Sequence, residues 1–335
     1  MMERICDVFL ARENDALSPY AFRTVDTRGR DHPYTPCSIR TEFQRDRDRI
    51  IHSKSFRRLM HKTQVFFLPE DEHYRTRMTH TLEVTQIARI IARALRLNED
   101  LTEAAALGHD LGHTPFGHAG EVAMRQCYDP GFAHYKQSLR VVDFLENDGE
   151  GLNLTYEVRD GIVNHTGEHM ASTLEGVIVK FADRIAYINH DIDDACRAGI
   201  LSLEDIPKPL LDTLGRGHSE RINRMVSAVI EASMDRPEIR MTDEIYEATM
   251  ELRAFLTHNV YTNSAAKTEE KKAQDMLIAL FRYFEEKPEQ MPPLYYGISQ
   301  SEGAGRAACD YVSGMTDRYA VELYRRLFIP EVWRG

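Results

Sequence analysis

The sequence lacks any run of about 18 apolar residues, the length that an α-helix needs to cross a bilayer. Charges at Glu3, Arg4 and Asp7 interrupt the N-terminal stretch, which argues against the apolar core of a secretory signal peptide. The five cysteines are odd in number and widely scattered, and no pair has the spacing of a metal finger. These absences predict a cytoplasmic protein with reduced thiols and no membrane partner.

A positive net charge is also absent. The formal charge of −11 argues against broad nucleic-acid binding, which usually shows as a basic surface. Residues 40–62 depart from this balance, with eight basic and three acidic side chains. Two interpretations stay open for this segment. It is either a solvated helix with ion pairs along its own surface, or a binding segment for a small anion such as phosphate.

Strand-like alternation is nearly absent, and helical periodicity takes its place. Apolar or small residues recur every three or four positions from His80 to Leu95, and Asn98 is placed to cap the helix that follows. The strongest apolar stripe predicts a helix over residues 174–196. Further helices are predicted over residues 222–234, 245–256, 276–284 and 319–327.

Departures from this helical pattern are few. Residues 62–69 suggest one short β-hairpin, and turn-forming residues predict loops over 26–36, 148–152 and, most clearly, 291–306. No repeat or compositional shift marks a domain boundary. The sequence therefore predicts a single all-α domain, with a core over about residues 40–200 and a helical C-terminal subdomain over 201–335.

Four side chains on the predicted helices have the chemistry of metal ligands. His80 continues the inward stripe of its helix, His109 and Asp110 lie near the end of the next one, and Asp183 follows on the helix over 174–196. One inward histidine is more often a core residue than a ligand, and one His-Asp dipeptide is weak evidence. The four in this order resemble the signature of the HD phosphohydrolase superfamily. Two imidazoles and two carboxylates suit a divalent ion such as Mn²⁺, Fe²⁺ or Co²⁺.

A second pattern extends along the helix that carries Asp183. Tyr187 and Asp191 follow at i+4 and i+8, so the three side chains share one face. The phenol can stack on a sugar ring and the carboxylate can accept a hydrogen bond from a sugar hydroxyl. The alternative is a tyrosine packed beneath an exposed acid.

Longer segments resemble one family more specifically. These are RDRDRIIHSKSFRRLMHKTQVF, HYRTRMTHTLEVTQIARIIARALRLNEDLTEAAALGHDLGHTPFGHAGE, VKFADRIAYINHDIDDA and DYVSGMTDRYA, which lie between residues 40 and 320. They are similar to the bacterial branch of the dGTPase-like deoxynucleoside triphosphate triphosphohydrolases. Residues 200–290 carry no motif that we can assign.

The resemblance implies a role for each matching residue. The implied metal ligands are His80, His109, Asp110 and Asp183. The implied catalytic residues are His118, Glu121 and His113, with His118 as the general acid held by Glu121. The implied substrate-binding residues are Arg58, Gln64, Arg77, His134, Lys180, Tyr187 and Asp191.

The implied reaction is hydrolysis of a dNTP, dGTP among them, at the α-phosphate to a deoxynucleoside and triphosphate. Two alternatives stay open: another HD phosphohydrolase, such as a 5′-nucleotidase or a nucleotide phosphodiesterase, and a dNTP-responsive sensor without turnover. The implied cofactor is a divalent ion, with Mn²⁺, Mg²⁺, Fe²⁺, Co²⁺ and Ni²⁺ all admissible. The resemblance also implies a homo-oligomer, a tetramer or a hexamer. It leaves open a regulatory dNTP and a nucleic-acid regulator, although the acidic charge does not indicate the latter.

Overall fold

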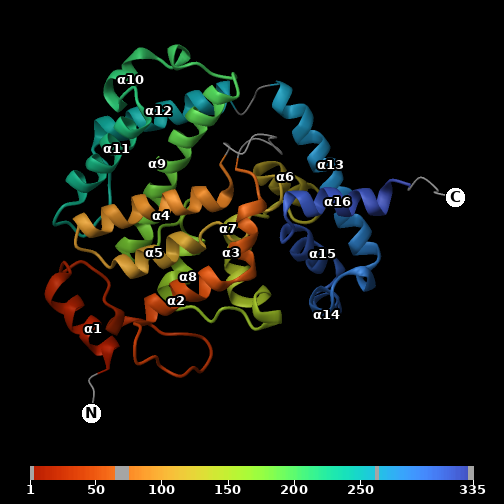
Figure 1. Ribbon diagram of the computed structural model, residues 1–335, viewed down its shortest axis with the longest axis horizontal. Coiled ribbons are helices and arrows are strands. Elements are labelled where there is room, and N and C mark those ends of the chain that lie inside the picture. Colours follow the sequence, from red (N-terminus) through yellow and green to blue (C-terminus); the bar gives the residue numbers. More distant parts are fainter. Residues whose placement is uncertain (1–3, 65–74, 261–263, 331–335) are drawn as a thin grey trace. The chain divides into compact units, whose positions relative to one another are not determined.

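The computed structural model describes residues 4–64, 75–260 and 264–330, and within these ranges it contains sixteen α-helices and no strand (Figure 1). The predicted all-α fold is confirmed. An isolated bridge pairs Thr63 with Thr76. The rest of the suggested hairpin lies outside the described residues. No described helix combines the length and the apolarity needed to span a membrane.

The chain forms two compact units, each assembled from three separate stretches. The first unit comprises Met1–His52, Thr79–His109 and Leu152–Asn263. The second unit comprises Ser53–Met78, Asp110–Gly151 and Ser264–Gly335. The subdomain boundary expected near residue 200 does not coincide with a boundary between these units, because residue 200 lies inside the stretch Leu152–Asn263 of the first unit. That subdomain division stays a prediction.

The first unit is arranged around one long helix, α9 (Leu174–Arg197), which packs against α5, α8, α11 and α12 (Figure 1). Its apolar stripe is buried, and the Thr173 hydroxyl caps it by accepting a hydrogen bond from the Gly176 amide at 3.1 Å. The predicted helix over 174–196 is thereby confirmed. The other helices of this unit are α1 (Ile5–Ala16), α2 (Glu42–His52), α4 (Arg77–Ala94, from its third residue), α5 (Glu99–Gly108), α8 (Tyr156–Val163), α10 (Lys208–Leu214), α11 (His218–Ser233) and α12 (Asp243–Asn259).

The Asn98 cap is also confirmed, because its side-chain oxygen accepts a hydrogen bond from the Leu101 amide at 3.2 Å. The cap fixes the start of α5, and α5 delivers His109 at its other end. A short 3₁₀ turn, η1, spans Thr24–Asp26, and the chain that follows it up to residue 36 is irregular. The irregular stretch predicted over 26–36 is thus confirmed.

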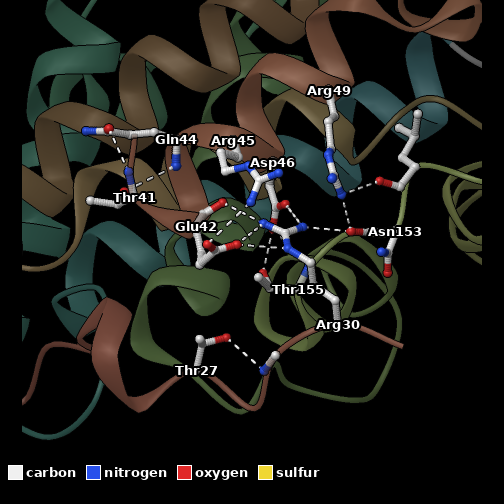
Figure 2. Close-up of polar contacts among 12 residues, drawn as sticks. Thr27, Arg30, Thr41, Glu42, Gln44, Arg45, Asp46, Arg49, Asn153 and Thr155 are labelled. Atoms are coloured by element: carbon white, nitrogen blue, oxygen red, sulfur yellow. Dashed lines mark hydrogen bonds and ion pairs between the residues drawn. The ribbon is translucent and has the colours of Figure 1, made fainter. Parts of the chain in front are cut away.

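That irregular stretch is tied down by one buried arginine (Figure 2). The Arg30 guanidinium donates to Glu42 Oε2 at 2.6 Å, to the Asn153 carbonyl at 2.7 Å and to Asp46. Asp46 in turn accepts hydrogen bonds from the amide and the hydroxyl of Thr155, at 2.8 and 2.6 Å. Three distant parts of the first unit are thus joined by one ion-pair network.

The basic segment over 40–62 is largely used inside the first unit where it forms α2. Arg40 pairs with Asp48 at 2.6 Å and Arg47 pairs with Glu103 at 3.3 Å. Arg49 donates to the carbonyl of Leu152 at 2.8 Å. These basic side chains are thus used in contacts within the first unit, and Arg47 and Arg49 make theirs with other elements rather than along the surface of α2 itself.

The second unit has a separate apolar core, in which α13 (Ser264–Glu286) packs against α6, α15 and α16. Phe281 and Met124 are among its largest fully buried side chains. The remaining helices of the unit are α3 (Lys54–Arg58), α6 (Gly117–Cys127), α7 (His134–Arg140), α14 (Pro293–Ser301), α15 (Ala304–Ser313) and α16 (Asp317–Phe328). Short turns of other helix types in this unit are η2 (Leu59–His61), η3 (Val141–Leu145), η4 (Asn147–Gly149) and η6 (Pro288–Gln290), whereas η5 (Leu203–Asp205) belongs to the first unit.

The predicted loop over 291–306 is wrong. It contains α14 and the start of α15, separated by Glu302 and Gly303. Pro293 occupies the first position of α14, where a missing N–H costs nothing, and Gly303 has a φ of +96° between the two helices. The proline and glycine residues that suggested a loop mark helix boundaries instead, and the buried Ile298 anchors α14.

Candidate active site

Three predicted metal ligands come together in the first unit. His80 lies on α4, His109 follows the end of α5, and Asp183 lies on α9. His80 Nε2 is 3.1 Å from Asp183 Oδ1, and His109 Nε2 is 3.9 Å from the same oxygen. Both imidazoles are buried. One carboxylate oxygen and two ring nitrogens thus face a common point.

A fourth donor in this group, His165, escaped the sequence analysis. It follows α8, and its donor atom lies with those of His109 and Asp183 in a group whose members are all within 4.8 Å of one another. The one possible sequence signal was its position just beyond a helix. That signal was missed because no helix was predicted over 156–163. The resemblance to the family assigned no role to this histidine.

The same local geometry orients His109 and His165. In each case the ring Nδ1 hydrogen-bonds to the carbonyl oxygen three residues earlier, to Ala106 at 2.6 Å and to Ile162 at 2.7 Å. Nδ1 must donate in both contacts because a carbonyl only accepts. In the neutral form of each ring, Nε2 therefore keeps its lone pair, and this is the tautomer that ligates a metal through Nε2.

The environment of Asp183 favours the ionised form of its carboxyl group. Burial opposes its ionisation, but close contact with the imidazoles of His80 and His109 holds the pKa of this carboxyl well below its usual range. A carboxylate that is ionised at neutral pH suits a divalent cation.

Further along α9, Tyr187 and Asp191 lie where the helical spacing places them, on the face that Asp183 occupies. Asp191 is buried, and burial raises the pKa of the Tyr187 hydroxyl to about 12. The phenol is therefore neutral at working pH. Lys180, on the preceding turn of α9, instead donates to the carbonyls of Gly167 and His169 at 2.7 and 3.0 Å.

In the second unit, Asp110 is held between two of the predicted residues. Arg77 Nη1 donates to Asp110 Oδ2 at 2.9 Å, and His113 Nε2 lies 3.3 Å from Asp110 Oδ1. Burial, reinforced by the positive charge of Arg77, lowers the pKa of His113 well below its usual value. His113 is therefore a neutral imidazole at neutral pH. Gly117 lies beside this group with a φ of +52°, in the left-handed region that favours glycine.

Glu121 is bound more closely by His134 than by His118. Its Oε1 is 2.7 Å from both the Nδ1 and the backbone nitrogen of His134, whereas His118 Nδ1 is 3.8 Å from Oε2. The His118 side chain is 77 % exposed. Burial would raise the pKa of Glu121, but its hydrogen bonds with these two histidines hold the carboxyl well below its usual range. The ring of His134 stacks on His113 at a centroid distance of 3.9 Å.

Arg58 and Gln64, the remaining predicted residues, also belong to the second unit. Arg58 donates to the Gly314 carbonyl at 3.1 Å and lines a pocket of about 750 Å³. Tyr295 and Tyr311 line the same pocket. Gln64 is the last described residue before the stretch over 65–74.

Comparison with known proteins places these residues in a family. The profile of the HD domain matches residues 77–188, which include all four predicted metal ligands, and that of the phosphohydrolase-associated domain matches residues 239–326. A deoxyguanosinetriphosphate triphosphohydrolase-like protein of Caldanaerobacter subterraneus subsp. tengcongensis is 58 % identical over 96 % of this chain and 95 % of its own length. The chain belongs to the deoxyguanosinetriphosphate triphosphohydrolase-like family.

Other members of this family are less similar but match over nearly their whole length. Proteins with the same name from Desulfatibacillum aliphaticivorans and Clostridium tetani are 46 % and 45 % identical, over 97 % and 96 % of this chain and 98 % and 95 % of theirs. A solved structure, a hypothetical protein from Aquifex aeolicus, aligns with 84 % of this chain and 71 % of its own at a TM-score of 0.47 and 18 % identity. As a family member with an HD domain, the chain is a hydrolase.

Proposed function

We propose that this chain is a metal-dependent triphosphohydrolase that converts a dNTP to a deoxynucleoside and triphosphate. The observation that carries the proposal is the convergence of His80, His109 and Asp183 on one point of the first unit. The names of its relatives support a deoxynucleoside triphosphate as the substrate.

The residues present fit a divalent cation. Two buried imidazoles offer Nε2, one carboxylate is ionised, and the ring of His109 is fixed by its own helix. Asp110 is the proposed fourth ligand, since it follows His109 directly in the chain. A bound divalent ion supplies positive charge at the phosphate and lowers the pKa of a coordinated water.

The residues of the chain supply binding and proton transfer. Arg77, oriented by Asp110, is the proposed contact for a phosphate oxygen. Tyr187 and Asp191 offer a neutral ring and a carboxylate to the deoxyribose. His118 is the proposed general acid for the departing 5′-oxygen, because imidazole titrates near working pH and the exposed side chain reaches solvent. Glu121 is the proposed positioning residue for His118 and His134.

The test is a turnover assay with Mn²⁺ on each dNTP alone and on all four mixed, with the products separated by chromatography. Release of triphosphate together with deoxynucleoside supports the proposal. Release of phosphate or pyrophosphate would point instead to a nucleotidase or a phosphodiesterase. Binding of dNTPs without turnover in any mixture would leave the sensor as the function.

His118→Ala tests the proton donor within the same assay. We expect turnover to fall by about 10²- to 10⁴-fold, the usual contribution of a general acid, while the Mn²⁺ content stays that of the wild type. His32→Ala is the matched control, since the exposed His32 contacts Asn153 through its backbone. Unchanged turnover in His118→Ala would remove this residue from the mechanism.

A further inference from the structure

A fourth histidine, His190, lies next to His80, on the side of the ring away from Asp183. His190 Nδ1 is 3.4 Å from His80 Nδ1, and the two rings meet edge to face at 86°. His190 follows Asp183 by seven residues, which is two turns of α9, and only 1 % of its surface is exposed. The same helix therefore offers a carboxylate to one nitrogen of His80 and an imidazole to the other.

The contact continues to Glu83. His190 Nε2 is 2.9 Å from Glu83 Oε2, and Glu83 lies one turn after His80 on α4. The three side chains thus form a row from the interior toward the surface, where 39 % of the Glu83 side chain is exposed. Two helices alternate along this row, α4 at both ends and α9 in the middle.

Only one placement of protons satisfies the row when His80 ligates a metal. Ligation through Nε2 uses the lone pair of that nitrogen, so the ring proton of His80 is on Nδ1. His190 Nδ1 must then accept, which places the proton of His190 on Nε2, facing the Glu83 carboxylate. Every contact in the row joins one donor to one acceptor.

Packing holds the middle ring in place. His218 stacks on the ring of His190 with a centroid distance of 6.1 Å and an interplanar angle of 12°. His218 Nδ1 is itself 2.8 Å from Asp193 Oδ2. His190 is therefore fixed in orientation before any ligand binds.

We propose that His190 and Glu83 are positioning residues for the metal ligand His80, setting its tautomer and its ring orientation. The inference rests on the proposed metal site. Groups that hydrogen-bond to a ligating histidine typically change metal affinity by 10- to 100-fold when they are removed. The row assigns this role to two residues that have no part in the proposed chemistry.

The test measures Mn²⁺ affinity of the metal-free protein by titration calorimetry in a set of matched variants. His190→Phe keeps a planar ring but removes the acceptor, and we expect Mn²⁺ binding to weaken by about 10- to 100-fold. His190→Asn and His190→Gln introduce the same amide group on side chains that differ in length by one methylene. Asparagine places its oxygen near the former Nδ1, toward His80, and glutamine places its amide near the former Nε2, toward Glu83.

The expected order of affinity is wild type, then His190→Asn, then His190→Gln and His190→Phe. Glu83→Ala is expected to weaken binding several-fold, whereas Glu231→Ala, on the exposed face of α11, leaves it unchanged. Thermal unfolding of each metal-free variant separates loss of the fold from loss of the ligand. Equal affinity in wild type and His190→Phe would overturn the inference, as would equal losses in the asparagine, glutamine and phenylalanine variants.

Failure of the metal site itself gives a different result. In that case the wild type binds no Mn²⁺, and His80→Ala changes nothing. When the wild type binds Mn²⁺ and His80→Ala abolishes binding, the metal site stands, and the His190 variants alone decide the role of the row.

Discussion

At the scale of single residues, Gly112 shows how closely the second unit packs around its predicted catalytic residues. A Cβ at this position would collide with backbone atoms of Ser138 and Gln137 and would meet the His134 carbonyl oxygen at 2.7 Å. The Gly112 amide also donates to the Ser138 hydroxyl at 2.9 Å. The glycine thus lets α7, which begins at His134, approach the chain that carries His113.

We therefore expect Gly112→Ala to lower the free energy of unfolding by about 3 kcal/mol, since backbone cannot move aside as a flexible side chain can. Gly297→Ala is the matched control, because nothing lies within 4 Å of its Cβ and it is inside α14. That variant should gain about 0.5–1 kcal/mol from helix propensity. Denaturant unfolding of both variants checks the difference, and a similar change in the two would contradict the packing argument.

Glu175 gives the first unit a predicted pH dependence. Its Oε1 accepts hydrogen bonds from the amides of Phe22 and Asn98 at 2.9 and 3.0 Å, and burial raises the pKa of this carboxyl to about 7. The unfolded chain releases the proton near the ordinary value of 4.5, whereas the folded protein holds it. The associated stability is fully present below that lower value and is lost as the pH rises to about 7, by about 3 kcal/mol in total.

Glu175→Gln should remove this dependence. Relative to the wild type, its free energy of unfolding is expected to rise by about 2–3 kcal/mol between pH 5 and pH 8. Glu231→Gln, an exposed site on α11, controls for the loss of one carboxyl group. Parallel pH profiles for the wild type and Glu175→Gln would show that Glu175 is ionised in the folded protein throughout.

At the scale of elements, the stretch after η1 is held to α2 by Arg30 rather than by a helix of its own. Arg30 pairs with Asp46 (Figure 2), and the side chains of both residues are fully buried. Removing one partner of a buried pair leaves an uncompensated charge and costs about 3–5 kcal/mol.

Arg30→Met should therefore destabilise the protein by about 3–5 kcal/mol in denaturant unfolding. Arg40→Met makes the same substitution in the pair with Asp48, where half of the arginine side chain is exposed, and should cost less than about 1 kcal/mol. Similar losses of unfolding free energy in the two variants would mean that burial of the Arg30 network adds nothing to stability.

The elements also show what the sequence could predict. Helices with long apolar stripes, such as the one over 174–196, and the Asn98 cap follow from periodicity and local hydrogen bonding. Residues 291–306 were mistaken for a loop because proline and glycine at helix boundaries have the same local signal as in turns. The Arg30 network was not predictable, since no local pattern pairs Arg30 with Glu42 or Asp46, and Asn153 is 123 residues away.

At the scale of the whole molecule, binding of a divalent ion should couple to stability. A ligand that binds only the folded state at about 100 times its dissociation constant adds about 2.7 kcal/mol. We expect Mn²⁺ to raise the melting temperature of the wild type and to leave that of Asp183→Ala unchanged. Asp235→Ala, which removes a mostly exposed carboxylate, should keep the full rise. A rise in Asp183→Ala equal to that of the wild type would place the ion elsewhere.

The order of His80, His109, Asp110 and Asp183 along the chain, which resembles the HD signature, was enough to propose them as metal ligands, and the structure brings His80, His109 and Asp183 together. The distribution of hydrogen bonds among them was not predictable. His165, His190 and the close contact of Glu121 with His134 depend on how separate helices pack. Residue types indicate which chemistry is available, whereas packing decides which groups meet.

The carbonyl contacts of His109 and His165 have a consequence for how this chain tolerates changes in length. Each ring is oriented by a carbonyl only three residues away, so its direction is inherited from the register of its own helix end. One residue inserted between Ala106 and His109 would rotate that imidazole by about 100° around the helix axis. Insertions in the irregular stretch over 27–41 would shift no such ring. We therefore expect length variation among family members to fall outside these two helix ends.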